Sequence, residues 1–155
     1  MFSKIVVDQI LDCFPVARLG QLDGAGAAQN LPFVFARVGG ALWSPIDGKP
    51  KKYAALDRIN WIEDHPEVCV LVDHYEADWS RLWWLKLYCV GRVVRGHHEH
   101  WQVAQNALAN KYSQYEDIPM FAGQPTMLRF EIKRWKSWAA SGDDFLDTWL
   151  ADTTG

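Results

Sequence analysis

The chain has 155 residues, 49% of them hydrophobic and 23% charged, and a formal net charge of −3. This length and composition are typical of one globular domain, residues 1–155, that buries most of its apolar surface. The slight negative charge argues against general nucleic-acid binding, and no apolar run reaches the ~20 residues of a membrane-spanning helix. Three scattered cysteines and no secretory leader predict a cytoplasmic protein.

The spacing of apolar and turn-forming residues predicts short strands and a few helices. The expected elements in chain order are helix 2–14, strands 17–23, 29–38 and 41–45, helix 51–64, strands 68–73 and 81–95, helix 101–112 and strand 127–135. The acidic tail, residues 142–155, is expected to be loosely held, although Phe145, Leu146 and Trp149 allow one amphipathic turn to dock.

Six expected strands with only two internal helices favour a mainly β, α+β fold. A small six-stranded antiparallel Greek-key barrel with flanking helices fits this order. A doubly wound sheet does not, because it needs a crossover helix between strands. Gly91, inside the strand at 81–95, predicts a bulge or a close approach of another chain segment.

Residues 73–84, DHYEADWSRLWW, follow the buried strand directly and carry three tryptophans. Large aromatic side chains at a strand end must be covered by core, by a partner chain or by a planar ligand. In the strand that follows, Trp84, Lys86 and Tyr88 alternate with apolar residues and therefore share one face. That aromatic and cationic face is interpreted either as a dimer seam or as part of a ligand site.

The segment 47–52, DGKPKK, places three lysines where a helix begins. The positive end of the helix dipole disfavours cations there. The cluster is therefore either a solvated group of lysines or, with free backbone N–H groups, a grip for a phosphate or polycarboxylate. The sequence pattern leaves both readings open.

The histidines at 97, 98 and 100 lack the spacing and the third ligand of a metal centre, so no metal site is expected. His74, beside the aromatic segment, is a candidate proton donor. The chain has no dinucleotide-binding glycine motif, no phosphate-binding loop and no nucleophile motif. A binding cleft without catalytic machinery of its own favours chemistry carried by a cofactor.

From about residue 15 to 141 the sequence resembles the pyridoxamine-phosphate-oxidase-like split β-barrel flavoproteins. The first strands, ARLGQLD at 17–23 and NLPFVF at 30–35, carry the general likeness. Further segments resemble one subgroup, which is labelled as oxidoreductases that use the deazaflavin coenzyme F-420. They are DGKPK at 47–51, HPEV at 65–68, DHY at 73–75, DWSRLWW at 78–84 and RWKSW at 134–138.

The resemblance implies an FMN-binding type of split barrel and a homodimer with two cofactor sites at the subunit interface, each holding coenzyme F-420 or FMN. In that reading Lys49, Lys51 and Arg58 hold the anionic tail. The ring lies against Asn30, Pro32 and Phe33, beside a wall formed by Trp79, Trp84, Lys86 and Trp138.

The implied activity is hydride transfer between the cofactor and a small conjugated organic acceptor, with water, His74 or Tyr75 supplying a proton. Two alternatives stay open. One is a non-catalytic cofactor carrier or haem-binding protein on the same barrel. The other is a carbohydrate- or protein-binding module that uses the tryptophans as a stacking surface.

Overall fold

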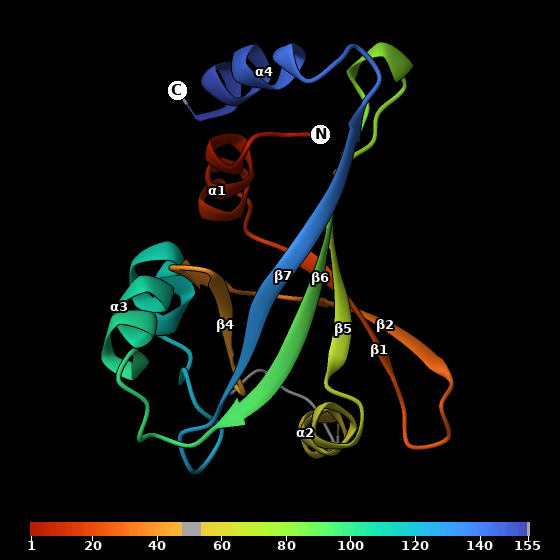
Figure 1. Cartoon of the computed structure of the whole chain (residues 1–155). Coiled ribbons are helices and arrows are strands. Elements are labelled where there is room, and N and C mark those ends of the chain that lie inside the picture. Colours follow the sequence, from red (N-terminus) through yellow and green to blue (C-terminus); the bar gives the residue numbers. More distant parts are fainter. Residues whose placement is uncertain (48–53, 155) are drawn as a thin grey trace.

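The computed structural model describes residues 1–47 and 54–154 of the chain, without the side chains of 54–56 and 154. Within this part, seven strands form one antiparallel sheet in the order β2-β1-β5-β6-β7-β4-β3 (Figure 1). The strands are β1 (Ala17–Leu22), β2 (Ala28–Phe33), β3 (Ala36–Val38), β4 (Ala41–Pro45), β5 (Glu67–His74), β6 (Trp83–Val94) and β7 (Met127–Ala139).

The described residues also form four α-helices: α1 (Lys4–Cys13), α2 (Ala54–Asp64), α3 (Trp101–Lys111) and α4 (Asp144–Thr154). Two 3₁₀ turns, η1 (Trp79–Arg81) and η2 (Ser113–Glu116), lie in the connections. Ser3 begins α1 by accepting a hydrogen bond from the Val6 N–H, as N-cap residues do. Among the described helices, none has the length and apolar character needed to cross a bilayer.

The prediction of six strands was wrong, because the expected strand at 29–38 is two strands, β2 and β3. They separate at Phe35, whose backbone pairs with a side chain instead of a neighbouring strand. Its N–H donates to the Tyr112 hydroxyl at 3.0 Å, and its carbonyl accepts from the same hydroxyl at 2.8 Å. Tyr112 follows α3, so a distant helix interrupts the strand and satisfies the freed backbone groups.

The main hydrophobic core lies between the sheet, α1, α2 and α4, and a smaller one lies between α3 and strands β3 and β4. Gly91 of β6 packs closely against a side chain of α2 and a ring of β7, whereas the bulge that was its alternative reading lies elsewhere in the ladder. A Cβ atom there would sit 3.1 Å from the Ile62 side chain and 3.2 Å from the Phe130 ring. The glycine therefore allows helix and strand to pack at this distance.

The ladder between β6 and β7 contains one extra residue. Cys89 pairs with Ile132 and Tyr88 pairs with Arg134, so Lys133 is left over as a bulge. Side chains of β7 alternate between the two faces of the sheet, and the bulge shifts this alternation by one residue. Arg134, Lys136 and Trp138 consequently share a face with Tyr88, Lys86 and Trp84.

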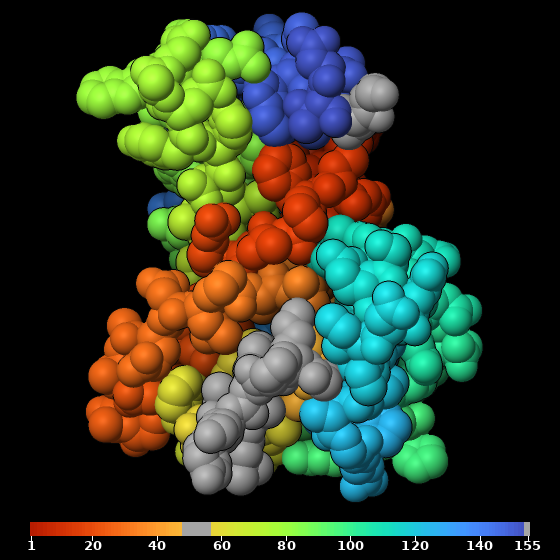
Figure 2. All heavy atoms as spheres, turned by 180° about the vertical axis from the view of Figure 1, so that it is seen from behind, coloured from red at the N-terminus to blue at the C-terminus, as the bar shows by residue number. Residues whose placement is uncertain are grey.

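The tail after Ser141, which the sequence led us to expect as loosely held, forms α4 against α1. Leu146, Trp149 and Leu150 are buried, and the Trp149 ring stacks on Phe14 at a centroid distance of 5.7 Å. Figure 2 shows the β5–β6 connection projecting beside α4 at one end of the molecule. A hydrogen bond from the Ser141 hydroxyl to the Ser80 carbonyl, 2.6 Å long, joins the two segments.

Candidate functional site

Strands β1, β2, β5, β6 and β7 share an outer surface that none of the described helices packs against, here called the open sheet face. Directly paired residues lie on the same face of a sheet. The register therefore gives three neighbouring rows across it: Asn30-Gly20-Cys69-Tyr88-Arg134, then Pro32-Arg18-Leu71-Lys86-Lys136, then Asp73-Trp84-Trp138.

These rows carry four cations and one acid. Lys86 lies over the rings of Trp84 and Tyr88 at 5.7 and 5.6 Å, and Arg134 lies over Tyr88 at 3.6 Å. The acid, Asp73, is 3.4 Å from Arg18. A hydrogen bond from Lys86, together with the charges of Lys86 and Lys136, lowers the pKa of Tyr88. The face therefore favours bound negative charge.

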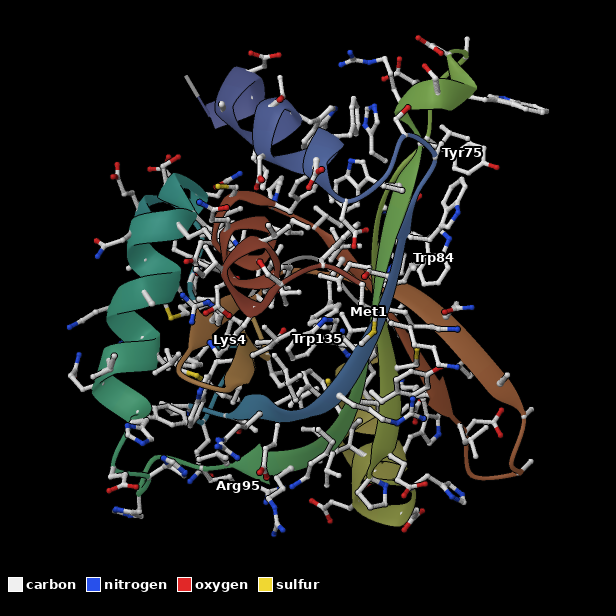
Figure 3. The ribbon with its side chains drawn as sticks, turned by 45° about the horizontal axis from the view of Figure 1, so that its top comes forward. Met1, Lys4, Tyr75, Trp84, Arg95 and Trp135 are labelled. Carbon is white, nitrogen blue, oxygen red and sulfur yellow. The ribbon has the colours of Figure 1, made fainter. Side chains whose placement is uncertain are left out.

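A pocket of about 340 Å³ opens on this face, lined by Leu71, Asp73, Tyr75, Trp84 and Lys86. Figure 3 shows Tyr75 and Trp84 pointing outward on the same side of the sheet. Trp138 pairs with Trp84 on the adjacent strand and is 45% exposed. The structure thus brings together four of the residues singled out from the sequence.

A second pocket, of about 240 Å³, collects two residues of β2 and one of α2 that the sequence also pointed to: Pro32, Phe33 and Arg58. Arg58 is 6% exposed, and its burial lowers its pKa, which the charge of Asp47 counteracts. Asp47 also accepts a hydrogen bond from the Tyr115 hydroxyl at 2.8 Å. A buried cation beside apolar walls is suited to holding an anionic group.

Lys49 and Lys51 lie outside the described residues, directly after Asp47 in the chain. Their expected role as an anion grip stays a prediction. The segment 48–53 connects Asp47, which lines the second pocket, to α2, which carries Arg58.

Three other residues that the sequence singled out lie away from these two pockets. Asn30 lines a separate hollow of about 470 Å³ at the far end of the open sheet face. Trp79 lies on η1 and is 73% exposed. His74 is on the opposite side of β5 from Asp73, where its Nε2 contacts the Glu76 carboxylate and its ring lies 5.0 Å from that of Trp149.

The sequence reading placed Tyr88 on one face with Trp84 and Lys86, and the register confirms this. It gave no site role to Arg134, which lies over the Tyr88 ring at 3.6 Å, or to Asp47, which interacts with Arg58 and Tyr115. No signal existed for Arg134, because simple alternation from Phe130 and Ile132 places it inside. The described residues hold no cluster of three or more His, Cys, Asp or Glu side chains suited to a metal ion.

No protein-family model and no curated protein matches this sequence. Solved structures do match. HutZ, the heme storage protein of Vibrio cholerae, superposes with a TM-score of 0.68 at 13% identity, covering 90% of this chain and 95% of that one. An FAD-binding protein from Mesorhizobium loti gives 0.65 at 15% identity, with coverages of 88% and 92%. A putative pyridoxamine 5′-phosphate oxidase from Listeria innocua gives 0.58 at 16% identity, with coverages of 90% and 97%.

The chain shares its fold with these three proteins, one of which is a putative pyridoxamine 5′-phosphate oxidase. This confirms the fold expected from the resemblance, with seven strands in place of six. The names of the three proteins differ, referring to heme storage, to FAD binding and to an oxidase. The fold alone therefore leaves the reaction open.

Proposed function

We propose that this protein is an oxidoreductase that transfers hydride between bound coenzyme F-420, or FMN, and a small conjugated organic acceptor. The observation that carries the proposal is the open sheet face, where four cations and one acid surround two indoles. A cofactor with a flat ring and an anionic tail is complementary to such a surface in both shape and charge.

In one copy of the chain the residues expected to hold the cofactor line two separate pockets. The pocket around Arg58, about 240 Å³, is smaller than the ~300–1,000 Å³ of ordinary small-molecule sites. The pocket around Trp84 shares none of its lining residues with the Arg58 pocket. We therefore propose a homodimer in which the open sheet face of one protomer completes the Arg58 pocket of its partner.

The charge of the open sheet face supports this arrangement. The cationic rows of one protomer and the Arg58 guanidinium of its partner would repel one another without an anion between them. An anionic cofactor at the boundary would remove that repulsion. The apolar side chains Phe33 and Trp84 would then exclude water from the ring, and Arg58 would hold the anionic tail together with Lys49 and Lys51.

The cofactor would supply the hydride, and the protein would supply orientation and a proton. Of the two proposed proton donors, Tyr75 is favoured, because it lines the same pocket as Trp84 and Lys86. His74 lines a different cavity, near α1 and α4.

Titration of the purified protein with F-420 and with FMN, followed by tryptophan fluorescence, tests the proposal. Saturable quenching by either cofactor is expected, with F-420 binding more tightly. Tight FMN binding without F-420 binding would reverse the order of the two cofactors. Sedimentation measured in parallel should show a dimer. A monomer that binds the cofactor fully would contradict the proposed site shared by two protomers.

A non-catalytic haem-binding role is the second candidate, and the likeness to a heme storage protein favours it. Haemin titration distinguishes the two. A sharp Soret band with no turnover of F-420 or FMN by added reductant would support the haem-binding role and contradict the oxidoreductase.

A further inference from the structure

The hollow of about 470 Å³ on the open sheet face follows the first of its three rows, from Asn30 on β2 to Arg134 on β7. The two residues next to Asn30 in this row are small: Gly20, which has no side chain, and Cys69. Tyr88 and Arg134 stand at the other side of the hollow. The small residues therefore leave room on the sheet surface, and the volume is within the range of small-molecule sites.

Arg134 is held at its side of the hollow by an aromatic ring. Its guanidinium carbon lies 3.6 Å from the centre of the Tyr88 ring. A guanidinium that packs on a ring in this way uses its flat face for the contact. N–H groups at its edge stay able to donate, and their fork matches the two oxygens of a carboxylate.

Three cations of the open sheet face have no carboxylate partner within the described part of the chain. They are Lys86, Arg134 and Lys136. The fourth cation, Arg18, pairs with Asp73 at 3.4 Å. Positive charge beside the hollow is therefore left without a fixed counter-charge, and an anion bound there would gain from it.

Two further charged residues line the hollow and do not cancel this charge. Lys133 pairs with Glu131 at 2.8 Å. Glu67, the first residue of β5, is the one carboxylate among the described lining residues, and it is exposed. Water weakens the effect of an exposed charge on its neighbours. The described surroundings of the hollow therefore select an anion.

The hollow borders the pocket in which the proposed function places the cofactor ring. Tyr88 and Lys86 are two residues apart on β6, which is about 7 Å along a strand. Lys86 lies over the rings of both Tyr88 and Trp84, so it connects the two sites. The anionic tail of the cofactor is proposed to lie at Arg58, in a pocket that shares no lining residue with the hollow. The cations beside the hollow are thus left for a second anion.

We propose that the hollow binds a carboxylate group of the organic acceptor, so that the substrate is a small conjugated acid. Arg134 would hold the two carboxylate oxygens, and the conjugated part would extend past Lys86 toward Trp84. The identity of the bound acid as the substrate rests on the proposed function, whereas the carboxylate site rests on the geometry of the hollow.

Titration calorimetry with trans-cinnamate, and with trans-cinnamamide as its uncharged analogue, tests the proposal. Cinnamate is expected to bind saturably, both to the protein alone and to protein saturated with F-420 or FMN. It should bind about tenfold more tightly than the amide, which lacks the charge that pairs with Arg134. Equal affinity for the two compounds, or no binding of cinnamate, would overturn the proposal. Displacement of cinnamate by the cofactor would assign the hollow to the cofactor and would overturn it as well.

Two exposed arginines of neighbouring strands give a matched pair of variants. Arg134→Gln removes the positive charge from the lining of the hollow and should weaken cinnamate binding about tenfold or more. Arg92→Gln removes the same charge outside the lining and should leave the affinity within about twofold. Circular dichroism and thermal unfolding establish that both variants are folded. Equal loss of affinity in both would mean that only net charge matters and would refute the assigned site.

The outcome for the hollow can be distinguished from the outcome for the proposed function. Binding of cinnamate to the protein alone requires neither cofactor nor turnover. Failure of both F-420 and FMN to bind would contradict the oxidoreductase, while the preference for cinnamate over its amide still decides the carboxylate site. Saturable cofactor binding without that preference would leave the oxidoreductase in place and refute a carboxylate-bearing substrate.

Discussion

The two faces of strand β6 show how differently one stretch of chain can be used. Leu85 and Leu87 point inward and are fully buried, whereas Trp84 and Lys86 point outward and stay half-buried. The inward and outward side chains alternate with one another along the strand. The inward set is expected to hold the fold together, and the outward set to bind. The following predictions test that division, from the largest expected effect to the smallest.

Truncation of one leucine on each face tests the division most directly. Leu87→Ala should lower the free energy of unfolding by about 2–5 kcal/mol, because Leu87 is completely buried in the main core. Leu71→Ala, on the open sheet face, should cost only about 1 kcal/mol. Urea unfolding at low protein concentration measures both. Similar losses in the two variants would mean that the open sheet face is also part of the core.

The cationic side chains of the open sheet face should matter for binding and little for stability. Lys86→Gln should weaken binding of F-420 or FMN about tenfold, roughly 1.5 kcal/mol, as expected for the loss of a charged hydrogen bond. Fluorescence titration measures this effect. Lys4→Gln is the control, because Lys4 is an exposed cation on α1, paired with Asp8. Equal effects of the two substitutions would indicate general charge attraction.

The close contact at Gly91 should resist even one added carbon. Gly91→Ala should lower the free energy of unfolding by about 1–3 kcal/mol, because the new Cβ meets the Ile62 and Phe130 side chains. Gly24→Ala is the control, since nothing lies within 4 Å of its Cβ position. Thermal unfolding compares the two. If Ile62→Leu, which removes the Cγ2 methyl that the new Cβ meets, restores stability to the Gly91→Ala variant, the steric cause is established.

The cysteines of neighbouring strands should differ in how they titrate. Burial raises the pKa of the Cys89 thiol to about 12 from an ordinary 9.0, and raises that of Cys69 on the open sheet face as well. An unfolded chain loses the Cys89 proton near pH 9 and the folded chain keeps it until about pH 12. Stability should therefore fall as the pH rises through this window.

Cys89→Ala should reduce that fall, as measured by urea unfolding at several pH values. In the native protein a thiol reagent should modify exposed Cys13 first and Cys89 last. Added F-420 or FMN should slow the modification of Cys69 if the open sheet face binds it. Rapid modification of Cys89 under native conditions would contradict its assignment to the core.

Much of the sheet was predictable because its strands are amphipathic over many residues. The alternation in β6 gave the correct inward and outward sets from Trp83 to Cys89, and the continuous apolar run gave β5. The break at Phe35 was not predictable, since it depends on a hydroxyl at Tyr112 that is distant in sequence. No local pattern reports a partner 77 residues away.

The site was predictable only in parts for the same reason. The aromatic segment at 73–84 marked Tyr75 and Trp84, which do line one pocket. The sequence also grouped His74 with them, because neighbours in sequence are read together. In a strand, neighbours face opposite sides, and the structure separates His74 from Tyr75 accordingly.

The leftover residue at Lys133 decides which way the end of β7 is turned. If Lys133 were paired as a regular residue of the ladder, Arg134 would follow Phe130 and Ile132 into the interior, and Trp138 would go with it. A deletion of Lys133 would therefore straighten the ladder and leave every later side chain on its present side. The same deletion at Lys136 would turn Trp138 over. Deletion of Lys133 should therefore keep the open sheet face as it is. A deletion a few residues further on should move the later side chains of β7 to the other face of the sheet.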